Sequence, residues 1–158
     1  EVFCDITNYL KLYKYVRDNM IHPEWLGTFT KEEIEEILLT GGKIWLYYDN
    51  KNLVCSMFYM PIEKKILLKH NVDLEENFVG SLGPIMVSPD YVGHGLQREM
   101  MNVLVNYCRS INKKYIFTKV CSDNVYSLNN MLKCDFKVVD QYINERGSNT
   151  ALIKKMEK

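Results

Sequence analysis

The chain has 158 residues, and its 20 basic and 20 acidic side chains give a formal net charge of zero. This length predicts a single domain over residues 1–158, and an apolar fraction of 47% is enough to build its core without disulfides or a metal ion. The neutral charge argues against a nucleic-acid-binding protein, which usually carries a basic face. No apolar run approaches the roughly 18 residues that a membrane helix needs, and no secretory signal pattern is present. We therefore expect a cytoplasmic protein with no nucleic-acid and no membrane partner.

The cysteines and histidines show no pattern of a metal site. The five cysteines are odd in number and widely spaced, so they form neither a zinc motif nor a disulfide framework. The three histidines likewise have no ligand spacing. We expect no metal, and we interpret the cysteines as buried thiols in a reducing compartment. They are Cys4, Cys55, Cys108, Cys121 and Cys134.

The N-terminal segment predicts a strand followed by a helix. Residues 1–6 alternate loosely between apolar and polar side chains, which is typical of a strand. Thr7 or Asn8 is then expected to cap a helix whose apolar positions follow at helical spacing. That helix is expected to end before Pro23, because the residue preceding a proline avoids the helical region.

A second helix and a hairpin are expected next. Thr30 and Glu33 have the spacing of a capping box, in which each side chain satisfies the other residue's free N–H group. Gly41 supplies the left-handed stop of this helix. Residues 44–48 and 53–60 predict two strands joined by a polar turn.

The rest of the chain alternates between strands and helices. Residues 61–77 are expected to be irregular. The apolar patterns after them predict a strand over 78–87, a helix over 96–111, a strand over 115–121, a helix over 126–133, and a final hairpin of 136–143 with 150–153.

This order predicts a mixed α/β fold with one crossover helix after a central strand. The strands through Ile85 and Phe117 are expected to be parallel neighbours. Because Pro84 cannot donate a ladder hydrogen bond, we expect their pairing to fail toward the C-terminal ends.

The segment after the central strand carries the chemistry. A proline-containing loop leads through Gly93 and Gly95 into a helix that begins at Leu96. The N–H groups at a helix start carry the positive end of the helix dipole, and glycines permit a close approach by phosphate. The alternative is a tight loop with no ligand. The sequence matches neither the dinucleotide fingerprint, which needs a third glycine at Arg98, nor the Walker motif.

A second motif follows the next strand. Asn124 stands at the start of another helix, where it is the natural cap and where its amide is also able to reach a ligand.

Together these motifs resemble the Gcn5-related N-acetyltransferases. The resemblance is most specific between residues 78 and 136, and it implies a single-domain acyl-CoA N-acyltransferase fold. Such a fold has a mixed, mostly antiparallel sheet with splayed parallel central strands and flanking helices. The matching segments are Val87-Ser88-Pro89, Tyr91-Val92-Gly93-His94-Gly95-Leu96-Gln97, Asn124-Val125-Tyr126-Ser127 and Asp135-Phe136.

The resemblance implies acetyl-CoA as cosubstrate and assigns residues to it. By strand-like hydrogen bonds, Ile85, Met86 and Val87 would hold the pantetheine arm. Asn124 and Ser127 would line its other side. The pyrophosphate would lie on Val92, Gly93, His94, Gly95, Leu96 and Gln97.

Four positions depart from the family pattern. Val92 replaces an arginine or glutamine, and Gln97 replaces a small residue. Met131 stands where the family has a tyrosine that protonates the departing thiolate, and Asp135 stands where it has a glycine. A positioned acid contributes about 10²–10⁴-fold to a rate, so Met131 predicts a slower enzyme.

The leading prediction is an acetyl-CoA-dependent N-acetyltransferase in which a primary amine attacks directly in a ternary complex. The alternatives are a non-catalytic acyl-CoA-binding module, favoured by Met131, and an α/β domain without a coenzyme A site. The general base is not placed. The catalytic residues are therefore unknown. The weak candidates are Glu24, which is otherwise interpreted as a surface acid, and Tyr126, the phenol nearest the cofactor motif, which is otherwise interpreted as a packing residue. The acceptor is expected to be a small-molecule or peptide amine, and the protein a monomer or homodimer.

Overall fold

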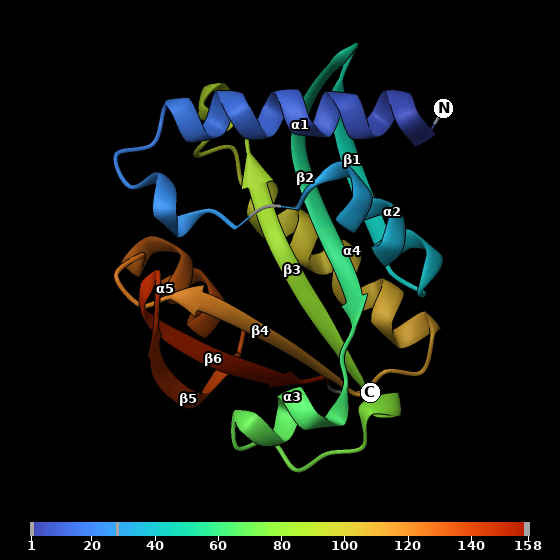
Figure 1. The fold of residues 1–158 in the computed structure, drawn as a ribbon, viewed down its shortest axis with the longest axis vertical. Helices are drawn as coiled ribbons and strands as arrows, with labels where there is room; N and C mark the ends of the chain where they lie inside the picture. Colours follow the sequence, from blue (N-terminus) through green and yellow to red (C-terminus); the bar gives the residue numbers. More distant parts are fainter. Residues whose placement is uncertain (1, 28, 157–158) are drawn as a thin grey trace. The chain divides into compact units, whose positions relative to one another are not determined.

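Residues 2–27 and 29–156 are described by a computed structural model, with side chains from Ile6 onward (Figure 1). None of the helices in these ranges is long and apolar enough to cross a membrane. The elements are α1 (Val2–Asp18), η1 (Pro23–Trp25), α2 (Lys31–Leu39), β1 (Lys43–Asp49), β2 (Asn52–Pro61), α3 (Lys64–Lys69), η2 (Glu76–Phe78), β3 (Val79–Val87), η3 (Pro89–Tyr91), α4 (Leu96–Ser110), β4 (Tyr115–Cys121), α5 (Val125–Lys133), β5 (Lys137–Asn144) and β6 (Gly147–Lys155), where η marks a 3₁₀ turn.

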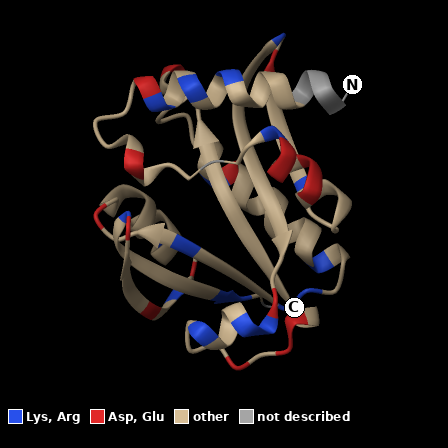
Figure 2. Cartoon of the chain, in the orientation of Figure 1, with Lys and Arg blue, Asp and Glu red and all other residues tan. Residues whose placement is uncertain are grey.

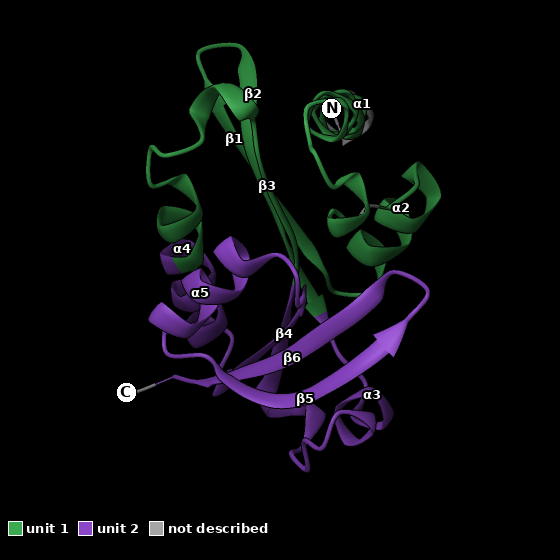
Figure 3. Ribbon diagram, turned by 90° about the vertical axis from the view of Figure 1, so that its left-hand side faces the viewer, with its two compact units in different colours: residues 1–60, 83–101 green, residues 61–82, 102–158 purple. Residues whose placement is uncertain are grey.

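The chain divides into two compact units (Figure 3). Unit 1 consists of residues 1–60 and 83–101, and unit 2 of residues 61–82 and 102–158. Unit 1 contains α1, α2, the β1–β2 hairpin and the C-terminal half of β3. Unit 2 contains α3, β4, α5 and the β5–β6 hairpin. β3 and α4 each continue from one unit into the other.

The strands form a six-stranded sheet in the order β1-β2-β3-β4-β6-β5. The β1–β2, β4–β6 and β5–β6 pairs are antiparallel. β3 and β4 are parallel, with Val79–Ser81 opposite Tyr115–Phe117. The expected mixed, mostly antiparallel sheet with a parallel central pair is therefore confirmed.

The parallel backbone pairing between β3 and β4 ends after its third residue pair, Ser81 with Phe117. The next carbonyl of β3, that of Leu82, accepts a hydrogen bond of 3.3 Å from the side-chain hydroxyl of Thr118 on β4. A side-chain donor at this position indicates that the backbones no longer pair as in a regular ladder. The wider separation expected further along the two strands stays a prediction.

The prediction of a first strand over residues 1–6 is wrong. One continuous helix, α1, occupies the described part of this segment, and Thr7 and Asn8 lie inside it rather than capping it. Glu1 lies outside the described residues. The short alternation was misleading because Ile6 continues the 3.6-residue stripe of the helix. The buried members of that stripe are Ile6, Tyr9, Leu12 and Val16.

The N-terminal helices end by recognisable signals. α1 ends at Asp18, four residues earlier than Pro23 alone would require, and Pro23 begins the 3₁₀ turn η1. The capping box of α2 is confirmed, because the Glu33 N–H donates to Thr30 Oγ1 at 3.2 Å and the Thr30 N–H donates to Glu33 Oε1 at 3.1 Å. Gly41 has a φ of 97°, as its left-handed role requires. The β1–β2 hairpin is likewise confirmed.

The prediction that residues 61–77 are irregular is also wrong, because α3 lies within them. This helix is only six residues long, too short to display a helical period in the sequence. Its Leu67 is fully buried. Asn71, with a φ of 66°, ends it in the left-handed conformation, and the Val72 N–H donates back to the Leu67 carbonyl at 2.9 Å.

Each unit has its own hydrophobic core. In unit 1, Phe58 is fully buried, with its ring edge-on to Tyr9 at 5.3 Å and to Phe29 at 5.1 Å between centroids. A Cβ on Gly83 would lie 2.8 Å from the Phe58 Cβ, so the glycine lets β3 approach β2 closely. In unit 2 the core contains Leu67, Val72, Val79, Phe117 and Ala151.

The cysteines are only partly as expected. Cys55 and Cys108 are buried, and burial raises the pKa of both thiols to about 12, which leaves them protonated at neutral pH. Cys121 and Cys134 are half-buried, so the prediction of buried thiols is wrong for these two. The Cys4 side chain lies outside the described residues.

Candidate functional site

The loop between β3 and α4 belongs to unit 1 and begins with a tight turn. At the end of β3 the Ser88 N–H donates to the Val54 carbonyl of β2 at 2.8 Å. Ser88 then caps the 3₁₀ turn η3, because its hydroxyl accepts from the Asp90 N–H at 3.4 Å and its carbonyl accepts from the Tyr91 N–H at 2.9 Å. The chain therefore leaves the sheet in one defined direction before the glycines begin.

The two glycines of the loop adopt left-handed conformations. Gly93 has a φ of 88° and Gly95 a φ of 77°, and a Cβ added to either would meet no atom within 4 Å. The Gly95 carbonyl accepts the first helical hydrogen bond of α4, from the Glu99 N–H at 3.1 Å. Within the described residues, the N–H groups of Gly93, Gly95 and Leu96 have no acceptor. The loop thus presents open backbone donors at the positive end of a 15-residue helix.

Long-range hydrogen bonds fix this loop on the rest of unit 1. The Tyr15 hydroxyl of α1 donates to both carboxylate oxygens of Asp90, at 3.2 and 3.1 Å. The Tyr91 hydroxyl donates to the carboxylate of Asp49 at the end of β1. Sequence reasoning missed these anchors because the partners are 75 and 42 residues apart and follow no motif.

The first turn of α4 has an anchor of the same kind. The Tyr47 hydroxyl on β1 donates to Glu99 Oε1 at 3.1 Å. In all three pairs the hydrogen bond to the carboxylate is the main cause that raises the pKa of the phenol above its ordinary value. The phenols therefore remain protonated donors throughout the neutral range.

A cavity of about 550 Å³ opens beside the loop within unit 1. Its walls come from α1, from the start of β2 with the preceding turn, and from the loop itself. They are formed by Asn8, Lys11, Leu12, Tyr15, Lys51, Asn52, Leu53, Val54, Ser88, Asp90 and Tyr91. Three of these residues, Ser88, Asp90 and Tyr91, also shape the glycine loop.

The C-terminal end of β3 leads directly into this loop. Ile85 and Val87 are half-buried, whereas the Met86 side chain is buried in the core of unit 1. Met86 is therefore able to offer a ligand only its backbone, and truncating its side chain would remove core packing. The strand runs unbroken through Pro84.

The second motif lies in unit 2. Asn124 caps α5, because its side-chain oxygen accepts from the Ser127 N–H at 3.3 Å. The capping interpretation of Asn124 is thus confirmed. Its amide nitrogen has no acceptor in the described part of the chain, and Ser127 is half-buried one turn further along.

Two departures from the family pattern have clear structural counterparts. Asp135 follows α5 with a φ of 67°, the left-handed conformation for which glycine is favoured and which aspartate tolerates. Its N–H donates to the Leu132 carbonyl, and the Phe136 N–H donates to the Met131 carbonyl, both at 3.1 Å. These two hydrogen bonds form the C-terminal cap in which glycine usually takes the left-handed position, and here Asp135 takes it. Met131 itself is 4% exposed and belongs to the core.

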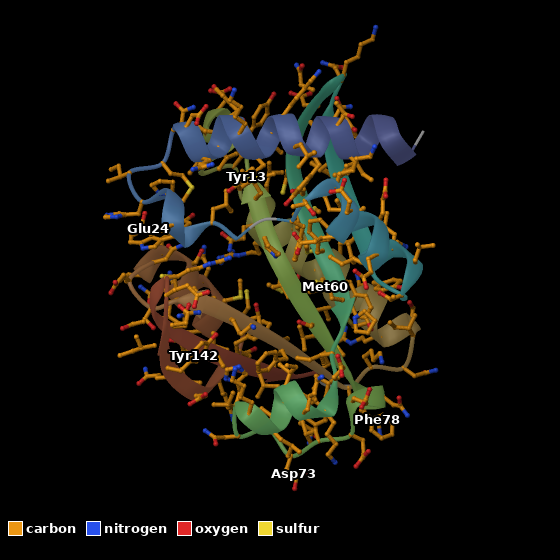
Figure 4. All side chains as sticks on the ribbon, viewed as in Figure 1. Tyr13, Glu24, Met60, Asp73, Phe78 and Tyr142 are labelled. Carbon is orange, nitrogen blue, oxygen red and sulfur yellow. The ribbon has the colours of Figure 1, made fainter. Side chains whose placement is uncertain are left out.

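The two candidate catalytic residues lie in different units. Glu24 is in the turn η1 of unit 1 (Figure 4), half-exposed, with its carboxylate 3.1 Å from Nδ1 of His22. His22 in turn stacks on Trp25 at 4.3 Å between ring centroids. Tyr126 is 65% exposed on the first turn of α5. Among the described residues no group of three His, Cys, Asp or Glu side chains is placed to hold a metal ion.

Comparison with known proteins decides the family. The model of the acetyltransferase (GNAT) family matches residues 10–136, which is most of the chain and includes both motifs. The chain belongs to the GNAT family. No curated protein sequence matches this GNAT chain.

Solved structures share its fold at low sequence identity. An N-acetyltransferase from Staphylococcus aureus has a TM-score of 0.73 at 13% identity, with 97% of this chain and 93% of that chain covered. A ribosomal-protein-alanine N-acetyltransferase from Brucella melitensis has a TM-score of 0.71 at 15% identity, covering 97% and 95%. A GNAT family acetyltransferase from Elizabethkingia anophelis, solved with acetyl-CoA bound, has a TM-score of 0.62 at 12% identity, covering 80% and 84%. At such identities the likeness extends to the fold alone.

Proposed function

We propose that this GNAT chain is an N-acetyltransferase that transfers the acetyl group of acetyl-CoA to a primary amine by direct attack in a ternary complex. The observation that carries the proposal is the loop between β3 and α4. It presents the open N–H groups of Gly93, Gly95 and Leu96 at a helix start, fixed by side chains of α1 and β1. Backbone donors in this arrangement suit the pyrophosphate of coenzyme A.

The remaining contacts of the cofactor follow from the family resemblance. The backbone of Ile85, Met86 and Val87 hydrogen-bonds the amides of the pantetheine arm, as a neighbouring strand would. The buried Met86 side chain supports a main-chain role at this position. Asn124 and Ser127 line the pantetheine, and the Asn124 amide nitrogen is available to donate. Val92, His94 and Gln97 contribute their backbone to the phosphate loop.

The reaction forms an amide C–N bond and breaks the thioester C–S bond. The attacking amine must be neutral, and it loses one proton to a base or to water, while the departing thiolate gains one. A backbone N–H near the thioester carbonyl polarises it. Glu24 and Tyr126 remain the candidate base and acid. The Glu24 carboxylate lies 3.1 Å from Nδ1 of His22.

The proposal needs two further statements about the whole chain. We propose one domain over residues 1–158, because β3 and α4 each run through both compact units. The cytoplasmic location and the monomeric or homodimeric state remain predictions from the sequence.

The experiment that tests the function measures release of free thiol from acetyl-CoA with a panel of primary amines, together with the mass of the products. We expect thiol release that depends on the amine and a product heavier by one acetyl group. Tight acetyl-CoA binding without transfer to any amine would instead favour a non-catalytic acyl-CoA-binding module, the role that Met131 supports. Absence of both binding and transfer would contradict the proposal altogether.

Tyr91→Phe tests whether the anchored loop holds the cofactor. The variant loses the hydrogen bond to Asp49, so we expect the Kd for acetyl-CoA to rise several-fold. The matched control is Tyr107→Phe on α4. The pKa of Tyr91 is raised, chiefly by its hydrogen bond to Asp49, so the anchor is intact below pH 10 and is lost as the pH climbs through the raised value. An absorbance titration of tyrosinate should therefore lose a late-titrating phenol in the variant, and an unchanged titration would contradict the anchor.

Met131→Tyr tests whether the missing acid limits the rate. A tyrosine here restores the family's proton donor, so we expect kcat at saturating substrates to rise by about 10-fold or more, with little change in acetyl-CoA affinity. The larger side chain enters a core position, so stability should fall by about 1–3 kcal/mol. Met131→Phe is the control, since it adds the ring without the hydroxyl. Equal kcat values for the two variants would remove this position from the chemistry.

A further inference from the structure

A group of charged and aromatic side chains gathers on one face of unit 2 and is not used by the proposed function so far. It comes from the end of α3, from β4, and from the β5–β6 hairpin. We call it the β4–β5 cluster, and its members are Lys69, His70, Lys119, Asp140, Tyr142 and Arg146.

The sheet register places Lys119 and Asp140 on this face. Both are opposite Ala151 of β6, Lys119 from the β4 side and Asp140 from the β5 side. Residues directly opposite one another project to the same face of a sheet. Ala151 packs with Phe117 in the core of unit 2, so this is the face that α3 and its Leu67 cover. A small alanine thus lies between Lys119 and the acidic residue.

The acidic residue of the cluster already has a partner. The Asp140 carboxylate is 2.9 Å from Nδ1 of His70, whose side chain is only 4% exposed. The His70 ring is 4.7 Å from that of Tyr142 and 5.7 Å from that of Phe117 between centroids. Figure 4 labels Tyr142 on β5. These contacts hold His70, Asp140 and Tyr142 in fixed positions at the edge of the cluster.

Within the described residues, no ion pair joins Lys69, Lys119 or Arg146 to an acidic side chain, and Lys69 and Arg146 are both close enough to repel the Lys119 ammonium. Burial and the neighbouring charges of Lys69 and Arg146 lower the pKa of the Lys119 ammonium below its ordinary value. Figure 2 shows the basic residue of β4 and those of α3. A bound anion would offset the repulsion at Lys119, because Asp140, the one acidic side chain of the cluster, already contacts His70.

The turn that carries Arg146 is rigidly built. The Asn144 side-chain oxygen accepts from the Arg146 N–H at 2.9 Å and from the Asn149 amide at 2.8 Å. The same Asn149 amide donates to the Gly147 carbonyl at 2.9 Å, and Asn149 is itself buried. The hairpin end therefore presents Arg146 from a fixed backbone.

The position of Lys119 on β4 connects the cluster to the reaction. The last parallel pair of β3 and β4 is Ser81 with Phe117, and Lys119 follows two residues later on the same face as Phe117. On the proposed function, this is the stretch of β4 beside which the pantetheine arm takes the place of a strand. We take the acceptor amine to approach the thioester over this face of β4.

We propose that Lys119, with Lys69 and Arg146, binds a carboxylate or phosphate group of the acceptor, so that the amines this enzyme acetylates carry a negative charge. The inference rests on the proposed function, whose acceptor it specifies. A carboxylate and a phosphate share the chemistry that such a site recognises, and the test separates them.

The test compares amines that differ only in their charged group. The panel is β-alanine with β-alaninamide and n-propylamine, and O-phosphoethanolamine with ethanolamine. We expect the anionic member of at least one set to have a kcat/KM about 10-fold or more above its neutral counterparts, mainly through a lower KM. Lys119→Met should abolish this preference. Lys133→Met, an exposed lysine on α5, is the matched control and should preserve the preference.

Failure of this inference is distinguishable from failure of the proposed function. Equal kcat/KM values for charged and neutral amines would overturn the inference while the acetyltransferase assignment stands. If no amine is acetylated, calorimetric binding of β-alanine and O-phosphoethanolamine still tests the site without turnover. Weakened binding in the Lys119→Met variant would then support the anion site, and unchanged binding would overturn it.

Discussion

Replacing Gly95 by valine is expected to weaken the binding of acetyl-CoA by about 100-fold or more while the protein stays folded. A Cβ at Gly95 meets no atom of the chain within 4 Å, so the new side chain enters the open space in front of the loop, where the phosphates are proposed to bind. Loss of two hydrogen bonds to a charged phosphate, at about 1.5 kcal/mol each, corresponds to about 100-fold in affinity. Calorimetric titration with acetyl-CoA measures the change.

The matched control for Gly95→Val is Gly147→Val in the β5–β6 turn. Gly147 also has a positive φ, 108°, and also has open space at its Cβ, so both variants place an L side chain in the same disfavoured backbone region. Each should lose about 1–2 kcal/mol of stability, but only the change at Gly95 should weaken acetyl-CoA binding. A folded Gly95→Val protein with the affinity of the unmodified chain would exclude this loop from the cofactor site.

Phe58→Ala is expected to cause the largest loss of stability. Phe58 is fully buried and contacts the rings of Tyr9 and Phe29. Replacing its ring by a methyl group therefore leaves a cavity between β2, α1 and the segment before α2. Phenylalanine-to-alanine changes in cores cost about 3–5 kcal/mol, against a total stability of about 5–15 kcal/mol. Urea unfolding should show a lower midpoint with an unchanged slope.

Phe58→Leu is the control for this prediction. It keeps most of the apolar volume and should cost about half as much or less. A loss below about 1 kcal/mol for Phe58→Ala would mean that the ring is not central to the core of unit 1.

Elements that end in local signals were predictable from the sequence, and those without them were not. The capping box of Thr30 and Glu33 and the cap at Asn124 involve neighbours in the chain, so their chemistry is visible in the residues alone. The start of the N-terminal helix was predicted as a strand because a window as short as residues 1–6 fits both the strand and the helix period. The helix α3 is shorter than two full turns and gives no periodic signal.

The glycine loop was predictable as a candidate site, but its supports were not. Gly93 and Gly95 stand in a recognisable motif, and both adopt the left-handed conformation that the motif requires. Tyr15 and Asp90, by contrast, meet only because α1 folds over the end of β3 within unit 1 (Figure 1). The β4–β5 cluster is likewise created by strand register and a hairpin turn, which no local pattern encodes.

The central claim is that coenzyme A is held by the backbone of β3 and of the loop that follows it. Amide hydrogen exchange at Ile85, Met86 and Val87, measured with and without coenzyme A, tests this claim most directly. Hydrogen bonds to the pantetheine arm should slow exchange at one or more of these amides by about tenfold or more, with parallel protection at Gly93 and Gly95. Unchanged exchange at all five amides, with coenzyme A demonstrably bound, would place the cofactor elsewhere and contradict the account.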